Sequence, residues 1–336
     1  MKKLFRHATL LFALALAAPA LAADAVQVGA LRFVSSGGLY LAQERGYFKD
    51  EGLDVAFTFF DAAQPISVAV ASGDIAFGVT AITGGTLNLA GKGAIAMVAA
   101  QGAERKGYKG TTVIVSNAAF ARGVTGLDKL QGTSVAITQV GSSQHYMIGQ
   151  IAAANGYDLD KVDIKPLQGV PNMLAAVKSG QVDVALSPPQ FAQPMAKAGE
   201  AKVIGFFSSV ADYQYGAVFT SPKLVASNAA LVQRFVRAYQ KGNGDYGKAL
   251  LRLDAKGEAV VDDEARAAAG QIAKYVYANE AAETAAPKIL ASAVYVEPSA
   301  RLDIADIERQ IAWYKKEKLV TPNVEAKAFV DLTFAR

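Results

Sequence analysis

The chain has no cysteine, one tryptophan and only two histidines among its 336 residues. The lack of cysteine excludes disulfides, thiolate metal ligands and a thiol nucleophile, so a folded state must be stabilised by its apolar core. His145 is the only histidine after residue 22, which excludes a zinc site built from several histidines. Beyond the N-terminal region no stretch reaches ~18 uninterrupted apolar residues, and we therefore expect no direct insertion into a membrane.

The first 22 residues have the features of a secretory signal peptide. Three basic residues precede an apolar run at 10–18, and Ala20-Leu21-Ala22 fits a cleavage site. We expect cleavage of this Sec-type signal and a periplasmic location, with an uncleaved anchor as the alternative. Without residues 1–22 the chain holds 31 basic and 30 acidic residues. That balance leaves no basic excess to bind nucleic acid.

Apolar stretches rich in β-branched residues alternate with helical patterns along the chain. Strands are predicted at 26–33, 53–60, 75–80, 111–117, 134–138, 162–167, 182–187, 201–210 and 215–221. The alternation predicts two α/β lobes, each a mixed, mostly parallel sheet flanked by helices. We predict one lobe from 23–115 plus 217–336, with a helical C-terminal part, and the other from 116–216. The two strands that cross between them would form a hinge.

Two segments about a hundred residues apart resemble each other. Residues 69–80 are AVASGDIAFGVT, and residues 176–187 are AVKSGQVDVALS. Each predicts a helix end, a glycine stop and a strand that ends in a hydroxyl residue, Thr80 or Ser187. We expect these segments to occupy equivalent places in the two lobes, with the two hydroxyls facing each other across a ligand.

Four loops follow predicted strands and are rich in serine, threonine and glycine. Ligands of open α/β sheets bind outside the carboxyl ends of the strands, and helix starts there offer free N–H groups. Capping of the next helix alone also explains these residue types. The predicted ligand-binding residues in the loops are Ser35, Ser36, Gly37 and Gly38; Thr80 and Thr83; Gly141, Ser142, Ser143 and His145; and Ser187, Pro188 and Gln190.

Several other residues near the predicted cleft are further candidates. Tyr213 and Tyr215 precede the returning strand, and we expect them to line the cleft, with ordinary packing as the alternative. Arg32 and Arg105 are the best placed partners for an anionic ligand, although either could be a solvated surface charge.

Other motifs do not support an enzyme. Residues 242–247 formally match G-x-G-x-x-G, but they follow a predicted helix rather than a strand. We interpret them as a turn at the end of that helix. His145 lies beside two serines, yet the chain has no G-x-S-x-G elbow for a hydrolase. We therefore expect no catalysis, no metal and no cofactor.

Five motifs resemble the NMT1/THI5-like family of exported solute-binding proteins, which serve ABC importers of nitrate, sulfonates, taurine and thiamine precursors. The motifs are LYLAQERGYFKDEGLDV at 39–55, SGDIAFGVT at 72–80, GSSQHYM at 141–147, SGQVDVA at 179–185 and DIERQIAWYKKEKLV at 306–320. The resemblance implies a type II periplasmic-binding-protein fold whose lobes close on a small molecule. It further implies a monomer that docks on the transmembrane subunits of a permease.

The resemblance also implies pocket residues. Carried over by position, they are Ser35, Ser36, Thr80, Thr83, Ser142, Ser143 and His145. One stretch departs from the family: many members have Trp-x-Pro-Tyr after the second repeated strand, where this chain has Ser187-Pro188-Pro189-Gln190. The expected ligand is a small organic anion or a heteroaromatic molecule. A ligand-sensing periplasmic module and an exported pyrimidine-metabolism enzyme of the same fold remain as alternatives.

Overall fold

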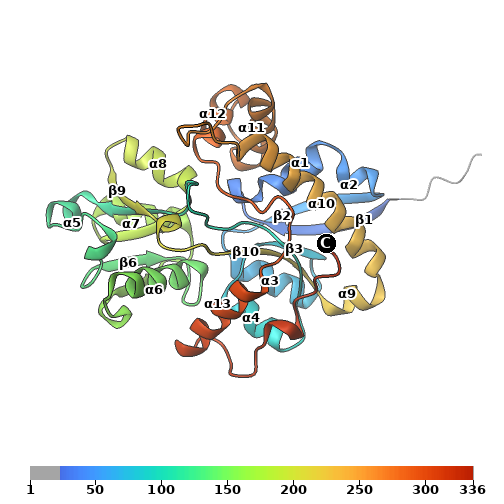
Figure 1. The fold of residues 1–336 in the computed structure, drawn as a ribbon, viewed down its shortest axis with the longest axis horizontal. Helices are drawn as coiled ribbons and strands as arrows, with labels where there is room; N and C mark the ends of the chain where they lie inside the picture. The colour runs from blue at the N-terminus through green and yellow to red at the C-terminus, as the bar shows by residue number, and fades with distance from the viewer. Residues whose placement is uncertain (1–22, 336) are drawn as a thin grey trace, which may run out of the picture.

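The computed structural model describes residues 23–335, so the predicted signal peptide lies outside the described residues. The described chain folds into two α/β lobes, each built on a five-stranded sheet with helices on both faces (Figure 1). This confirms the predicted fold class. Within residues 23–335, no helix combines the length and the apolarity that a membrane span requires.

The first sheet has the strand order β2-β1-β3-β10-β4. β1 is parallel to β2 and β3, whereas β10 runs antiparallel to β3 and β4. The strands β3, β4 and β10 are buried almost continuously, because helices cover both faces of the sheet. The bounds are β1 Asp24–Ala30, β2 Leu53–Phe59, β3 Phe77–Ala81, β4 Ala96–Ala100 and β10 Gly216–Thr220.

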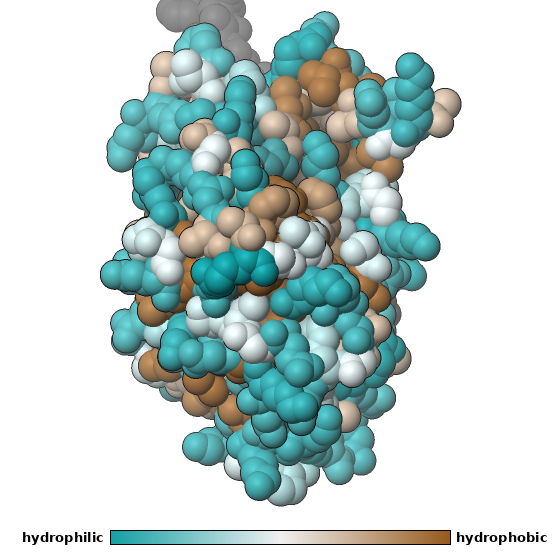
Figure 2. All heavy atoms as spheres, turned by 90° about the vertical axis from the view of Figure 1, so that its left-hand side faces the viewer, coloured by the Kyte–Doolittle hydropathy of each residue, from teal (hydrophilic) through white to brown (hydrophobic). Residues whose placement is uncertain are grey.

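The second sheet repeats this plan with the order β7-β6-β8-β5-β9. β6 is parallel to β7 and β8, and β5 is antiparallel to β8 and β9. The bounds are β5 Thr112–Ser116, β6 Ser134–Ile137, β7 Asp163–Pro166, β8 Val184–Ser187 and β9 Ala201–Phe206. The outer end of this lobe is mostly hydrophilic, with small apolar areas between the polar side chains (Figure 2).

The antiparallel strands β5 and β10 cross between the lobes. β5 follows β4 of the first sheet but joins the second sheet, and β10 follows β9 of the second sheet but joins the first. β5 pairs with β8 and β9. Residues 112–115, which were predicted to belong to the first lobe, therefore lie in the second sheet. Sequence propensity indicates that a strand exists but not which sheet it joins. The crossing segments 101–111 and 207–215 are hydrogen-bonded to each other: Glu104 N–H donates to the Tyr213 carbonyl at 2.7 Å, and the reverse bond is 3.1 Å.

The helices fall into groups around the two sheets. In the first lobe, α1, α10 and α11 pack on one face through a shared apolar cluster, while α3, α4 and α13 pack on the other (Figure 1). In the second lobe, α6 and α7 cover opposite faces. The bounds are α1 Gly37–Glu44, α2 Tyr47–Asp50, α3 Ala63–Ser72, α4 Gly84–Gly91, α5 Asn117–Ala121, α6 Ser143–Asn155, α7 Val170–Ser179, α8 Pro189–Lys197, α9 Pro222–Ser227, α10 Ala229–Leu250, α11 Asp263–Val276, α12 Ala282–Ala291 and α13 Ile304–Lys316, with 3-10 turns at Val34–Ser36, Leu127–Lys129, Leu159–Lys161, Phe207–Ser209 and Ala326–Ala328.

The two repeated segments occupy equivalent places, as predicted. β3 and β8 each lie at the centre of their sheet, and each follows a helix that ends at a left-handed glycine, Gly73 at φ 86° and Gly180 at φ 74°. The serine before each glycine even makes the same bond. Ser72 Oγ donates to the Ala69 carbonyl, and Ser179 Oγ to the Ala176 carbonyl, both at 3.1 Å.

The G-x-G-x-x-G segment at 242–247 is not a helix-end turn, contrary to the prediction, because it lies inside α10. A Cβ on Gly242 would stand 2.1 Å from the Gly38 carbonyl oxygen, and one on Gly38 would stand 1.8 Å from Asn243 Oδ1. The glycines therefore let α1 and α10 approach closely. Packing against a neighbouring helix outweighs the low helix propensity of glycine at these positions.

Candidate ligand-binding site

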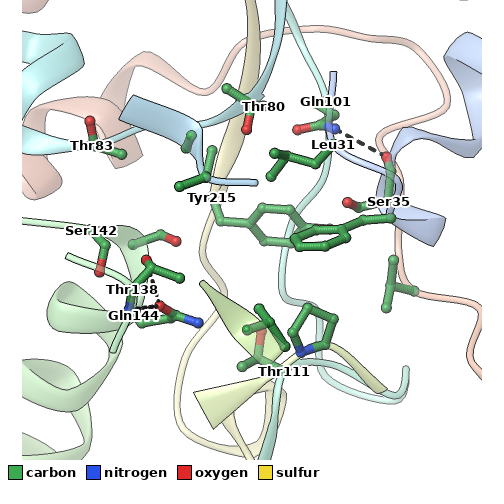
Figure 3. Close-up of a pocket in the computed structure, with 18 of the residues that line it drawn as sticks. Leu31, Ser35, Thr80, Thr83, Gln101, Thr111, Thr138, Ser142, Gln144 and Tyr215 are labelled. Atoms are coloured by element: carbon green, nitrogen blue, oxygen red, sulfur yellow. Dashed lines mark hydrogen bonds between the residues drawn. The ribbon is translucent and has the colours of Figure 1, made fainter. Parts of the chain in front are cut away.

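A cavity of about 100 Å³ lies between the lobes, bounded by the carboxyl ends of central strands and by the crossing segments (Figure 3). Both sheets contribute to it through the loops that follow β1, β3, β6 and β8. Nine of the predicted residues line it: Ser35, Ser36, Thr80, Thr83, Ser142, Ser143, Pro188, Gln190 and Tyr215. The other lining residues are Leu31, Phe33, Asp61, Ala62, Ala63, Ala81, Gln101, Glu104, Thr111, Thr138, Gln139, Gln144, Met147, Val170, Pro189 and Val294.

Thr80 has a hydroxyl without a partner in the described structure. Its side chain is 1% exposed, and its Oγ1 makes no hydrogen bond there. Thr80 lies near the end of β3 and borders the cavity (Figure 3). Buried hydroxyls are nearly always hydrogen-bonded, so this group is suited to meet a polar atom of a ligand.

Glu104 is a buried carboxyl in the first crossing segment, 1% exposed. It accepts hydrogen bonds from Thr111: the N–H reaches Oε1 at 2.9 Å, and the hydroxyl reaches the same oxygen at 2.7 Å. Burial raises the pKa of Glu104, an effect that the bonds from Thr111 oppose. Its carboxyl also contributes, after burial, to the raised pKa of the neighbouring Tyr215.

Several predicted hydroxyls are helix caps. Thr83 Oγ1 accepts from the Thr86 N–H at 3.0 Å, and Ser142 Oγ accepts from the His145 N–H at 3.3 Å. For these two residues the capping interpretation is right, although their side chains also border the cavity. Ser36 accepts from Gln101 Nε2 at 3.3 Å, so it too is already engaged.

The predicted anion partners lie elsewhere. The Arg32 guanidinium stacks 3.8 Å over the Phe59 ring and donates to the Tyr275 carbonyl at 2.8 Å. Arg105 lies 3.8 Å from the Asp212 carboxylate and borders a separate surface hollow. Neither arginine lines the cavity, because each finds an aromatic or acidic partner outside it.

The glycines of the first loop serve packing rather than ligand approach. A Cβ on Gly37 would stand 2.5 Å from the Tyr246 ring, and Gly38 faces Asn243 as described above. Gly141, with φ 79°, instead forms a contact between the lobes: its carbonyl accepts from the Gly84 N–H at 2.8 Å.

His145 and Tyr213 belong to an aromatic cluster beside the cavity. His145 packs edge-on against Trp313 of α13, with ring centroids 5.5 Å apart, and its Nδ1 accepts from the Gly141 N–H at 3.1 Å. Burial lowers the pKa of His145, which favours the neutral ring that this bond needs. Tyr213 stacks on Tyr146 at 4.7 Å and is buried. For Tyr213 the packing alternative is therefore the right one.

The second repeated strand ends differently from the first. Ser187 is fully buried and does not line the cavity. Its hydroxyl donates to the carbonyl of the next residue, Pro188, at 3.3 Å. The prediction that Thr80 and Ser187 face each other across a ligand is therefore wrong. Gln190 lines the cavity and also bridges the lobes, with its side chain bonded to the backbone of Arg32 and Val34.

Sequence reasoning missed the residues of the crossing segment. Gln101, Glu104 and Thr111 line the cavity, but they follow no Ser/Thr/Gly-rich loop. The available signal was one acidic residue, Glu104, in the segment that connects two apolar strands, β4 and β5. Among residues 23–335, no group of three or more acidic or histidine side chains is arranged to hold a metal ion.

Comparison with known proteins identifies relatives of this fold. The alkanesulfonate-binding protein SsuA from Xanthomonas axonopodis pv. citri, bound to MOPS, superposes with a TM-score of 0.70 and 17% identity over 92% of this chain and 98% of that chain. The nitrate-binding protein NrtA from Synechocystis PCC 6803 gives 0.69 and 12% over 91% and 85%. The desulfurization enzyme DSZB gives 0.61 and 14% over 93% and 97%. No curated protein sequence matches.

At these identities the structural matches establish the fold alone, and it is that of periplasmic binding proteins. The sequence profile described as "NMT1/THI5 like" matches residues 34–247, which is more than half of the chain. This range includes both repeated segments and all four loops that follow the central strands. The chain belongs to the NMT1/THI5-like family.

Proposed function

We propose that this protein is the periplasmic solute-binding component of an ABC importer. It binds one small molecule between its lobes and delivers it to the transmembrane subunits of a permease. The observation that carries the proposal is the interlobe cavity, which is lined by residues of both lobes. Hydrogen bonds between the lobes lie on both sides of this cavity. Small-molecule sites favour such enclosed, mostly apolar clefts between domains.

The contacts between lobes support a closing mechanism. Gly84 donates to the Gly141 carbonyl on one side, and Tyr314 donates to the Ser142 carbonyl at 3.0 Å nearby. Gln190 bonds to the backbone of the first lobe on the other side. A ligand would stabilise this closed form, and the permease would recognise the matched lobe surfaces.

The family and the names of the structural neighbours suggest where to look for a ligand. Two neighbours are named for alkanesulfonate and nitrate binding. The solutes to be tested for this chain are organic anions and heteroaromatic molecules, including pyrimidines. One neighbour is named an enzyme, so the fold alone does not decide against catalysis.

A thermal-shift screen of residues 23–336 tests the proposal. Nitrate, alkanesulfonates, aromatic carboxylates, amidines, amides and pyrimidines would be compared. A true ligand at a hundredfold excess over its dissociation constant stabilises the protein by about 2.7 kcal/mol. Ser143→Ala, at a cavity residue, should reduce the shift, whereas Thr58→Ala, on the exposed side of β2, should not. Failure of every compound to raise the melting temperature would argue against the proposal.

A further inference from the structure

The charged side chains that line the cavity are all acidic. They are Asp61, which is exposed, and Glu104, which is buried. No lysine, arginine or histidine of residues 23–335 lines the cavity. An anionic solute would therefore lie close to a buried carboxyl without a cationic side chain to balance it, an arrangement that costs free energy in a low-dielectric site.

Nearby cations do not alter this balance, because each has another partner. Arg32 stacks on Phe59 and donates to a backbone carbonyl. Arg105 lies beside Asp212 and over the Tyr295 ring, 5.6 Å from its centroid. The ring of His145 is held as an acceptor by the Gly141 N–H.

Glu104 keeps unused hydrogen-bonding capacity. Both short bonds from Thr111, at 2.9 and 2.7 Å, end on Oε1. Oε2 receives only the longer contact from the same N–H, at 3.2 Å. Oε2 lies against Gly110, where a Cβ would stand 1.7 Å from it, and its remaining acceptor positions have no hydrogen-bond partner in the described structure. Charge-assisted bonds of this kind are stronger than neutral ones.

Thr80 provides a second, independent sign of a ligand. Its Oγ1 is buried, borders the cavity and has no partner in the described structure. A bound molecule with a polar atom at this position would satisfy the hydroxyl. The Thr80 hydroxyl can donate or accept a hydrogen bond, so it does not determine the sign of the ligand charge. The Glu104 carboxylate only accepts and therefore favours a cation.

The rest of the cavity wall is largely apolar. Leu31, Phe33, Met147, Val170 and Tyr215 contribute side chains from both lobes and from the second crossing segment. Such a wall suits a compact apolar body, and the two aromatic rings favour a cationic or planar one.

We propose that the ligand is a small, mainly apolar solute with a positively charged N–H donor group, which binds Glu104 Oε2 while a second polar atom bonds Thr80 Oγ1. This inference rests on the proposed solute-binding function and narrows it: the site selects cations over uncharged isosteres, and both over anions. The acidic lining replaces the anion option expected from the sequence.

Benzamidine, benzamide and benzoate form a matched series of one ring with a cationic, neutral or anionic head. Isothermal titration calorimetry on residues 23–336 should show benzamidine binding about 10- to 100-fold more tightly than benzamide, with benzoate weakest. Glu104→Gln keeps the size and the bonds from Thr111 but removes the charge, so it should abolish the preference. Asp54→Asn, at an exposed acid of β2 outside the cavity, is the control and should keep it.

The pH dependence is a readout that a merely structural role of Glu104 would not produce. Since burial raises the pKa of Glu104 above its ordinary value, protonation as the pH falls through that raised pKa should weaken benzamidine binding but not benzamide binding. The Glu104→Gln protein should lose this dependence.

The outcomes separate this inference from the proposed function. If benzoate, benzenesulfonate or nitrate binds as tightly as benzamidine, solute binding stands and the cation preference is refuted. An equal preference for benzamidine over benzamide in Glu104→Gln and in the unaltered protein also refutes the inference. Failure of benzamidine to bind at millimolar concentration refutes it as well. If no compound of any charge binds in this or the wider screen, the solute-binding function itself fails.

Discussion

Gln190 in the second lobe bonds to Val34 in the first: the Gln190 Oε1 accepts from the Val34 N–H at 2.9 Å. The same side chain donates from Nε2 to the Arg32 carbonyl at 3.1 Å. One amide therefore satisfies two main-chain groups across the cleft. Phe33, between them, packs edge-on against Phe191, with ring centroids 5.4 Å apart. This stretch connects the two lobes.

Gln190→Ala should shift the protein towards an open form. The loss of these two hydrogen bonds between lobes, at about 1 kcal/mol each, should weaken ligand binding about 10- to 30-fold through the population of the closed state. Small-angle X-ray scattering should show a larger radius of gyration without ligand. Gln193→Ala, on the same helix, forms neither of these bonds and is the matched control. Equal scattering and affinity for both variants would contradict the latch role.

Thr80→Val should separate binding from stability. Valine is close in shape to threonine and removes a buried hydroxyl that has no partner, so the unliganded protein should keep or slightly increase its free energy of unfolding. Ligand binding should nevertheless weaken. Denaturant titration and calorimetry measure the two effects.

The matched control lies on the adjacent strand. Thr220 is also buried, but its hydroxyl donates to the Ala76 carbonyl at 2.7 Å. Thr220→Val should therefore cost about 1–3 kcal/mol of stability and leave binding unchanged. A stability loss in Thr80→Val as large as that of Thr220→Val would show that the Thr80 hydroxyl has a structural partner after all.

The alternation of strands and helices was sufficient to predict the two-lobed fold. Periodicity and glycine stops are local signals, and Gly73 and Gly180 end their helices as predicted. Two crossing strands were expected, but the sheet that β5 joins depends on long-range pairing, which no local pattern records. The same limit explains why 242–247 was misread, because only the neighbouring helix shows why glycine is needed inside α10.

The site was predictable in outline rather than in detail. The rule that ligands bind at the carboxyl ends of strands led to the loops that border the cavity. It could not separate Thr80, whose hydroxyl has no partner, from Thr83, whose hydroxyl caps α4, since both are threonines near the end of the same strand. Glu104 was missed because its importance comes from the crossing of two segments and from its burial.

Gly242→Ala and Gly244→Ala test the helix contact inside α10. A methyl group at 242 would meet the Gly38 carbonyl oxygen at 2.1 Å and the Ala42 Cβ at 2.8 Å, whereas one at 244 meets nothing within 4 Å. We expect Gly242→Ala to cost about 1–3 kcal/mol through overpacking. Gly244→Ala should instead stabilise by up to about 1 kcal/mol through helix propensity. Urea denaturation measures both, and similar changes in the two variants would contradict the packing role.

His145 should make the protein less stable in mild acid. Burial lowers its pKa from the ordinary 6.5, so below pH 6.5 the unfolded chain binds a proton that the folded chain does not yet take up. Stability is therefore complete above 6.5 and falls as the pH drops through that value towards the lowered pKa. His145→Asn keeps an acceptor for the Gly141 N–H but cannot titrate.

The comparison that matters is the slope of stability against pH, not the absolute stability, because the asparagine also loses contact with Trp313. Melting temperatures of residues 23–336 should decline less for His145→Asn than for the unaltered protein between pH 6.5 and the lowered pKa of His145. Since His145 is the only histidine after residue 22, NMR of its ring gives the folded pKa directly. A ring that titrates at or above 6.5, or equal slopes for the two proteins, would show that burial does not hold this imidazole neutral.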